Sequence, residues 1–201
     1  MTEILLLAAC YLIGGIPFGY LLVKMKSGQD VRSMGSGNIG ATNVLRTTGR
    51  AAGVATLILD IAKGALAVWL ADRLTHGSPL WMSLAALTVM AGHAYPVFLK
   101  FKGGKAVASF IGAFLYLTPL PLVAILLVFV VVVAATRFIS LGSIIGAGGF
   151  PIAVFLISHP PLPVLLAASA AGLFIVLRHK SNIDRIRAGN ENVFSLGGRK
   201  Q

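Results

Sequence analysis

A polar, glycine-rich stretch in the first quarter of the chain has the composition of an anion-binding site. Residues 35–49 read GSGNIGATNVLRTTG in a chain that is 57% hydrophobic. The glycines let successive backbone N–H groups converge on one point, and the short polar side chains and one guanidinium add further donors. These residue types suit an oxyanion or a phosphate group, although an ordinary capped surface loop has a similar composition. The candidate binding residues are Ser36, Gly37, Asn38, Gly40, Thr42, Asn43 and Arg46.

The same stretch predicts a short helix. Ser36 or Asn38 is a suitable N-cap, and Gly49 is a suitable end because glycine tolerates the left-handed conformation. On such a helix Asn38, Thr42 and Arg46 fall four residues apart and therefore share one face. The helix N-terminus would add free N–H groups and the positive end of its dipole to that face.

A second stretch, near position 100, combines glycines with basic residues. Gly103 and Gly104 precede an expected helix start, and Lys105 lies at its opening. The helix dipole disfavours a cation there unless an anion is bound as well, so Lys105 predicts a bound phosphate. Lys102 contacts either the same anion or lipid headgroups. His93, shortly before this stretch, is either a base or a hydrogen-bonded structural group.

A third polar stretch covers residues 177–192. Ser181 and Asp184 have the S-x-x-D spacing of a capping box, and Gly189 is expected to close the short helix that follows. The same stretch contains three further candidate side chains, namely His179, Asn182 and Glu191.

The elements that must position these stretches are apolar enough to cross a membrane. With 11% charged residues and a mean hydropathy of +0.88, the chain is too apolar for a soluble domain of this length. About seven apolar runs approach the ~20 residues that span ~30 Å of hydrocarbon. The fourth and fifth runs are short, and the alternative for them is a single broken hairpin. The runs are Glu3–Val23, Ala51–Ala71, Leu80–Leu99, Ala106–Leu117, Leu120–Ala135, Phe138–Ile157 and Pro163–Leu177. We therefore expect an all-α membrane protein, a single domain over residues 1–201 with seven transmembrane helices, in which short cytoplasmic helices and glycine-rich loops form the site.

The basic residues predict the orientation. With the N-terminus outside, only Arg73 falls in an outer loop and Lys63 falls within a span. Such an asymmetry indicates an odd number of spans with the C-terminus in the cytoplasm. The net charge of +11 then forms a basic cytoplasmic surface that contacts anionic lipid headgroups. Its residues are Lys24, Lys26, Arg32, Arg46, Arg50, Lys100, Lys102, Lys105, Arg137, Arg178, Lys180, Arg185, Arg187, Arg199 and Lys200.

Residues within the expected spans narrow the chemistry further. Asp60 and Lys63 share one face of the second span and predict a buried ion pair beneath the site, with direct use of Asp60 in the chemistry as the alternative. Cys10, the only cysteine, lies in the first span, which argues against disulfides and against a cytosolic cysteine nucleophile. The sequence contains no metal-binding or nucleotide-binding motif, so we expect no metal and no cofactor.

The three polar stretches border span ends on the predicted cytoplasmic side. Their convergence would make a basic pocket open to the cytosol and to lipid, suited to an anion with an acyl chain. In chain order, SGNIGATN at 36–43, GHAYP at 92–96 with KGGK at 102–105, and HKSNI at 179–183 followed by Gly189 and Glu191 closely resemble the bacterial acyl-phosphate-dependent glycerol-3-phosphate acyltransferases, the PlsY family. The resemblance covers nearly the whole chain.

The resemblance implies an enzyme of the bacterial inner membrane with its active site facing the cytoplasm. It would transfer a fatty acyl group from acyl phosphate to the sn-1 hydroxyl of glycerol 3-phosphate, giving lysophosphatidic acid and inorganic phosphate. Its partners would be these two substrates and membrane lipids, not nucleic acid, and we expect a monomer. Expected catalytic residues are Ser36, Lys105, His179 and Asn182; expected phosphate-binding residues are Arg46, Gly37, Asn38, Gly40, Thr42, Asn43, Lys102, Gly103 and Gly104; expected supporting residues are Asp60, Lys63, His93 and Glu191.

Alternatives of other classes concern both mechanism and function. His179 and Asp184 also match the H-x-x-x-x-D spacing of a larger acyltransferase superfamily, in which the aspartate orients a histidine base. One such pair arises often by chance, so we expect Asp184→Asn to leave turnover within a few fold and His179→Ala to lower it heavily. Glycine-rich helix ends with intramembrane charges also occur in anion transporters, but the outer side of this chain carries few polar residues. A structural subunit without a ligand would leave the three polar stretches unexplained.

Overall fold

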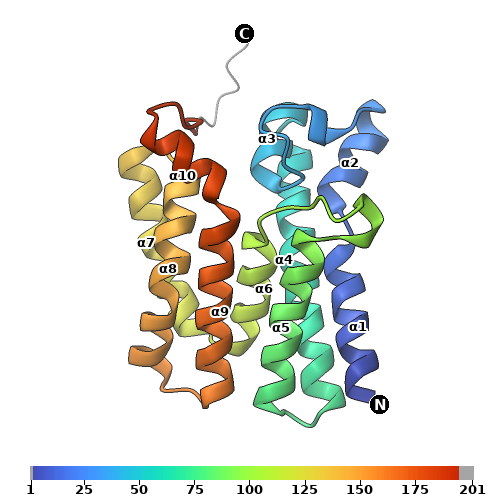
Figure 1. Ribbon diagram of the computed structural model, residues 1–201, viewed down its shortest axis with the longest axis vertical. Coiled ribbons are helices and arrows are strands. Elements are labelled where there is room, and N and C mark those ends of the chain that lie inside the picture. Colours follow the sequence, from blue (N-terminus) through green and yellow to red (C-terminus); the bar gives the residue numbers. More distant parts are fainter. Residues whose placement is uncertain (1, 195–201) are drawn as a thin grey trace. The chain divides into compact units, whose positions relative to one another are not determined.

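The computed structural model describes residues 2–194, which are helical and contain no strand (Figure 1). This confirms the all-α prediction. The chain forms two compact units, Met1–Leu117 and Thr118–Gln201, here called unit 1 and unit 2. The predicted cytoplasmic residues Arg199 and Lys200 lie outside the described residues. The single domain expected from the sequence stays a prediction.

Unit 1 begins with a helix that proline interrupts. α1 (Thr2–Gly15) and α2 (Phe18–Ser27) are separated by Ile16 and Pro17 but together form one apolar segment of 26 residues. Proline has no backbone N–H and its ring clashes with the preceding turn, which accounts for the break at Pro17.

Three longer helices complete unit 1: α4 (Arg50–Leu74), α5 (Pro79–Ala94) and α6 (Val107–Leu117). α4 packs against α6, α5 and α1, and α1 packs against α5. Glycines allow these close contacts, since a methyl group on Gly14 would collide with the backbone of Val89, and one on Gly64 with the backbone of Ser109.

Unit 2 contains α7 (Pro119–Thr136), α8 (Ile139–Ser158), α9 (Leu162–Arg178) and the short α10 (Lys180–Arg187). α8 packs between α7 and α9. α10 continues from α9 at an angle of 53°. This bend places the third polar stretch at the end of α9.

Five helical segments of the described chain are long and apolar enough to cross a membrane, and the bent pair of α9 and α10 makes a sixth. α6 is apolar but has 11 residues, which corresponds to about 16 Å, roughly half of the hydrocarbon thickness. The chain is therefore a multi-pass membrane protein, and the seventh crossing stays a prediction.

The remaining elements of unit 1 are short: η1 (Val31–Ser33), α3 (Ala41–Thr48) and η2 (Val97–Leu99). Within unit 1, α3 and residues 95–106 lie toward the end opposite the N-terminus (Figure 1). Two predicted polar stretches therefore share one end of this helical unit.

The predicted N-caps of both short polar helices are wrong. The N-cap of α3 is Gly40, because Oδ1 of Asn38 accepts a hydrogen bond from the Gly40 N–H, at 2.7 Å, outside the helix. α10 starts directly after His179 with no side-chain cap, so Ser181 lies in its first turn and forms no capping box with Asp184.

The predicted helix ends are correct. Gly49 has φ 109° and follows the last residue of α3. Gly189 has φ 70°, its N–H bonds to the Ile186 carbonyl, and the N–H of Asn190 bonds to the Arg185 carbonyl. This pair of hydrogen bonds is the Schellman motif, which glycine permits at low cost.

Candidate active site

The glycine-rich loop of unit 1 is organised by one buried amide. The Asn43 side chain accepts a hydrogen bond from the Ser36 N–H, at 2.9 Å, through Oδ1. Its Nδ2 lies 3.3, 3.0 and 2.8 Å from the carbonyl oxygens of Val31, Met34 and Asn38, so two hydrogens serve three acceptors. Asn43 is 2% exposed, and its amide bonds to these four backbone groups. It therefore fixes the path of residues 31–40.

Glycine is required at two points of this loop. Gly35 and Gly37 have φ of 55° and 72°, in the left-handed region that other residues disfavour. At Gly35 a Cβ atom would also collide with Oδ1 of Asn43. The loop bends tightly around the Asn43 amide and leaves Ser36 and Gly37 exposed, as an anion-binding segment requires.

Further along the chain, Thr42 and Arg46 lie four residues apart on α3 and share one face, as predicted. Asn38 belongs to the loop and is not part of that helical face. Arg46 is exposed. The loop and this helix thus supply hydroxyl groups and a guanidinium within one short stretch. The N–H groups of Ser36, Gly37 and Gly40 instead bond to Oδ1 of Asn43, the Met34 carbonyl and Oδ1 of Asn38.

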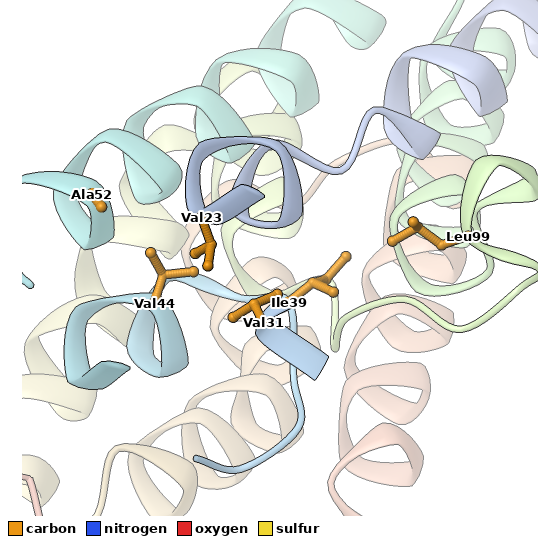
Figure 2. Packing of buried hydrophobic residues seen from close by; sticks show 6 residues of the cluster. All are labelled: Val23, Val31, Ile39, Val44, Ala52 and Leu99. Carbon is orange, nitrogen blue, oxygen red and sulfur yellow. The ribbon is translucent and has the colours of Figure 1, made fainter. Parts of the chain in front are cut away.

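An apolar cluster joins the first polar stretch to the second. Figure 2 shows its residues, which come from α2, η1, the loop, α3, α4 and η2. They are Val23, Val31, Ile39, Val44, Ala52 and Leu99. Burial of these side chains holds the loop against the turn that leads to Gly103.

An ion pair between Asp30 and Arg32, here called the clasp, lies near this cluster and was not predicted from the sequence. Arg32 pairs with Asp30 through Nε and Nη2, the latter at 2.7 Å, and its guanidinium lies 5.4 Å from the centre of the Tyr20 ring. The hydrogen bond from Arg32 lowers the pKa of Asp30 below its ordinary value. Nη1 of Arg32 also lies 3.5 Å from the Leu99 carbonyl. The only sequence signal was an acid and a base two positions apart, a spacing too common to be informative.

The second polar stretch passes closely over His93. The Gly104 N–H donates to the His93 carbonyl at 3.1 Å, and the Gly103 N–H donates to the Ala94 carbonyl at 3.2 Å. A Cβ atom on Gly104 would collide with the His93 ring, and one on Gly103 with the His93 carbonyl. Lys105 follows directly, two residues before the first residue of α6.

Beneath this stretch, the predicted ion pair within the second span is present. Nζ of Lys63 lies 2.6 Å from Oδ1 of Asp60, and both side chains are almost completely buried. Nδ1 of His93 lies 3.5 Å from the same carboxylate oxygen. All three supporting residues expected in unit 1 therefore lie together.

In unit 2, His179 lies at the junction of α9 and α10 and is buried. Its Nδ1 is 2.8 Å from the Ile175 carbonyl. Because a carbonyl oxygen only accepts hydrogen bonds, Nδ1 carries the proton, and Nε2 is the basic nitrogen of the neutral ring. Asp184 is exposed, so Nδ1 is oriented by the backbone of α9 and the H-x-x-x-x-D pairing gains no support.

Glu191 joins the third stretch to α8. Its Oε1 accepts from Nδ2 of Asn182 at 2.8 Å and from Oγ of Ser140 at 3.1 Å, while its Oε2 accepts from Nε of Arg185 at 2.9 Å. The carboxylate is 5% exposed. Glu191 therefore fixes the orientation of Asn182. No sequence pattern indicated that Ser140 and Arg185 would contribute.

The described residues contain no cluster of histidine, cysteine and acidic side chains that could hold a metal ion. Each unit instead contains donors suited to phosphate or to an oxyanion. In unit 1 these are the Ser36 hydroxyl, Arg46 and Lys105, and in unit 2 the amide of Asn182. His179 adds a basic nitrogen, because its Nδ1 hydrogen bonds to the Ile175 carbonyl.

The whole chain is similar to proteins of known activity. A family model described as glycerol-3-phosphate acyltransferase matches residues 4–189. The glycerol-3-phosphate acyltransferases of Geobacter sulfurreducens and Desulforamulus reducens are 45% and 44% identical to it, over 96% and 100% of this chain and 98% of each relative.

Solved structures agree with the sequence comparison. A crystal structure of PlsY (YgiH), an integral membrane glycerol 3-phosphate acyltransferase, in its glycerol 3-phosphate form matches with a TM-score of 0.91 and 36% identity, over 97% of this chain and 96% of that chain. The lysophosphatidic acid form matches with a TM-score of 0.87 and 34% identity, over 98% and 97% of the two chains.

Proposed function

Because this chain belongs to the glycerol-3-phosphate acyltransferase family, we propose that it transfers a fatty acyl group from acyl phosphate to the sn-1 hydroxyl of glycerol 3-phosphate. The products are lysophosphatidic acid and inorganic phosphate. The observation that carries this proposal is the match over almost the full length to a solved relative in its glycerol 3-phosphate form. The lysophosphatidic acid form of that relative supports the proposed product.

The proposed reaction is an acyl transfer without a protein nucleophile. The sn-1 oxygen attacks the acyl carbonyl carbon, a tetrahedral intermediate collapses, and the bond between that carbon and the phosphate oxygen breaks. The hydroxyl proton goes to Nε2 of His179 or to the departing phosphate. Because phosphate is a good leaving group, the protein mainly binds, orients and stabilises developing negative charge.

Unit 1 supplies most of the phosphate and oxyanion contacts in this proposal. Arg46, Lys105 and Lys102 neutralise the phosphate groups. The Ser36 hydroxyl donates to the substrates from the loop that Asn43 fixes, whereas the Gly37 N–H donates to the Met34 carbonyl at 3.0 Å and shapes the loop. The remaining binding positions are Asn38, Gly40, Thr42, Gly103 and Gly104. The hydrogen bonds between Asn43 and the backbone make it a residue that shapes the site.

Unit 2 supplies two side chains to the same reaction. His179 acts through Nε2, because Nδ1 donates to the Ile175 carbonyl. Asn182 acts through its amide, which Glu191 orients by accepting one of the two Nδ2 hydrogens. We propose no role for Asp184 in the chemistry, since it is exposed.

We also propose that the protein is a monomer of the bacterial inner membrane without a cofactor. Its N-terminus lies outside, and α6 completes seven crossings despite its length. Because Cys10 is the only cysteine, single cysteines placed in a Cys10→Ala protein report this orientation. We expect an impermeant maleimide to label Leu74→Cys in intact cells and Arg187→Cys only after lysis. The reverse pattern would contradict the proposed orientation.

The decisive experiment on function compares acyl phosphate, acyl-CoA and acyl carrier protein as donors for the purified protein in detergent. We expect lysophosphatidic acid and phosphate in equal amounts from acyl phosphate, and only when glycerol 3-phosphate is present. Activity with acyl-CoA alone would contradict the proposal that acyl phosphate is the donor. A phosphate transporter would release no phosphate from acyl phosphate in detergent, so the same assay separates the enzyme from the transporter.

A further inference from the structure

We propose that Asp60, Lys63 and His93 form a buried positioning network that sets the place of Gly103, Gly104 and Lys105, and through them the binding of glycerol 3-phosphate. This inference rests on the proposed function for the identity of the ligand. It assigns to these three side chains a role in binding that acts through the backbone of another segment. None of them needs to touch the substrate.

The network starts at an ion pair inside α4. Asp60 is 2% exposed and Lys63 is 3% exposed, with 2.6 Å between Oδ1 and Nζ. Nζ of Lys63 also donates to the Ile16 carbonyl at 2.9 Å, at the break between α1 and α2, where Pro17 leaves that part of the backbone without a regular helical pattern. The lysine thus connects α4 to the one interruption of the first span.

Stability alone is a weak reason to bury this pair. Removing two charges from water is costly, and apolar side chains of similar volume hold helices together at least as well. Ionisable residues within membrane spans are commonly functional for the same reason. The pair therefore calls for a role beyond helix packing, and its next contact indicates one.

That contact is His93 on α5, which is 4% exposed. Its Nδ1 lies 3.5 Å from Oδ1 of Asp60. This separation is long for a hydrogen bond but short enough for the carboxylate to orient the ring electrostatically in a buried site. Asp60 consequently influences which way the opposite edge of the imidazole, with Nε2, faces.

The opposite edge of the ring meets the backbone of the second polar stretch. A Cβ atom on Gly104 would collide with Nε2 of His93, and the Gly104 N–H already donates to the His93 carbonyl at 3.1 Å. One residue therefore holds Gly104 through both its backbone and its ring. Lys105 follows Gly104 directly, so a shift of the ring moves the backbone that carries the Lys105 side chain.

A variant that changes only the ring chemistry tests this inference. His93→Phe keeps an aromatic ring of similar size but removes Nδ1 and Nε2. We expect the KM for glycerol 3-phosphate to rise about tenfold while kcat and the KM for acyl phosphate stay within about threefold. A displaced Lys105 binds glycerol 3-phosphate more weakly, but the groups that carry out the chemistry are all still present. His93→Asn returns a donor near the Nδ1 position and is expected to recover part of the lost affinity.

The matched control is Ser83→Ala, a buried position on the same helix. It should leave all three constants within about twofold, since no hydrogen bond is removed. A second route to the same conclusion is the double variant Asp60→Asn with Lys63→Met, which removes both charges together and avoids leaving one of them unpaired. Like His93→Phe, this double variant should raise the KM for glycerol 3-phosphate.

Amide hydrogen exchange of residues 100–106 provides a readout that does not need activity. Faster exchange there in His93→Phe than in Ser83→Ala supports the network, and equal exchange overturns it. An unchanged KM for glycerol 3-phosphate in a folded His93→Phe enzyme, or a fall in kcat alone, also overturns it. A wild-type protein inactive with acyl phosphate would instead contradict the proposed function, while the exchange experiment still decides the inference.

Discussion

The polar stretches of the two units are held by different chemistry. In unit 1 a neutral amide, Asn43, bonds to four backbone groups. In unit 2 a carboxylate, Glu191, bonds to the side chains of Ser140, Asn182 and Arg185. Both side chains are almost fully buried, so each provides the surrounding polar groups with hydrogen bonds that water cannot supply there.

The difference indicates what each unit contributes. An amide has both donors and an acceptor, so it can bond to the carbonyl groups and to an N–H group of one loop and fix the path of its backbone. A carboxylate only accepts, so it collects donor side chains and fixes their orientation. We therefore expect unit 1 to act largely through a shaped backbone and its cations, and unit 2 through individual side chains.

The largest expected effect is the loss of the proposed base in unit 2. His179→Ala should lower kcat about 10²-fold or more, because general-base assistance typically contributes 10²–10⁴-fold. Steady-state turnover with acyl phosphate measures this effect. Asp184→Asn is the matched control and should stay within about threefold, since Nδ1 of His179 bonds to Ile175. Loss of activity in a folded Asp184→Asn enzyme would restore the His–Asp pair as the mechanism.

The second expected effect tests the backbone role of unit 1. Asn43→Asp keeps the size of the side chain but turns its two donor hydrogens into an oxygen facing three carbonyl oxygens. We expect activity to fall about 10²-fold and the free energy of unfolding to fall by at least about 2 kcal/mol. Thermal unfolding in detergent and the activity assay measure the two losses. A fully active Asn43→Asp enzyme would show that the loop does not depend on this amide.

A smaller effect is expected from the carboxylate of unit 2. Glu191→Gln keeps one oxygen for Asn182 and Ser140 but removes the charge that pairs with Arg185. We expect turnover to fall about tenfold with little change in the KM for glycerol 3-phosphate, because a partly held Asn182 is misplaced for only part of the time. A rise in that KM with unchanged turnover would remove the distinction between the two units.

The smallest expected effect concerns the clasp of Asp30 and Arg32. The pKa of Asp30 is lowered in the folded protein, so its contribution to stability is present above the unfolded pKa of about 3.9 and is lost as the pH falls through the folded pKa. Because both side chains are about one-third exposed, the contribution is below about 1 kcal/mol. Melting temperatures of wild type and Asp30→Asn should differ near pH 7 and converge as the pH falls below the lowered folded pKa of Asp30. A difference in melting temperature that persists at low pH would mean that it does not come from the ion pair.

The sequence was informative where the physical signal is local. Apolar runs and the glycines at 49 and 189 predicted spans and helix ends, because each depends on a few neighbouring residues. The predicted N-caps were wrong because Asn38 and Ser181 each suit more than one position near a helix start, and a sequence pattern does not show which position each takes. Asn43 was recognised as a polar residue of the site, but its bonds to the backbone up to 12 residues away were not.

The sequence by itself determined that this chain is a multi-pass membrane protein, which residues carry its donors, and which family it resembles, since these follow from composition, order and spacing. Tertiary structure decided which donors are exposed and which are committed to other groups. Asn43 and Glu191 became supports, Arg32 became a clasp, and His93 came to lie between Asp60 and Gly104. These outcomes depend on contacts between residues far apart in the chain, and only packing of the helices brings such residues together.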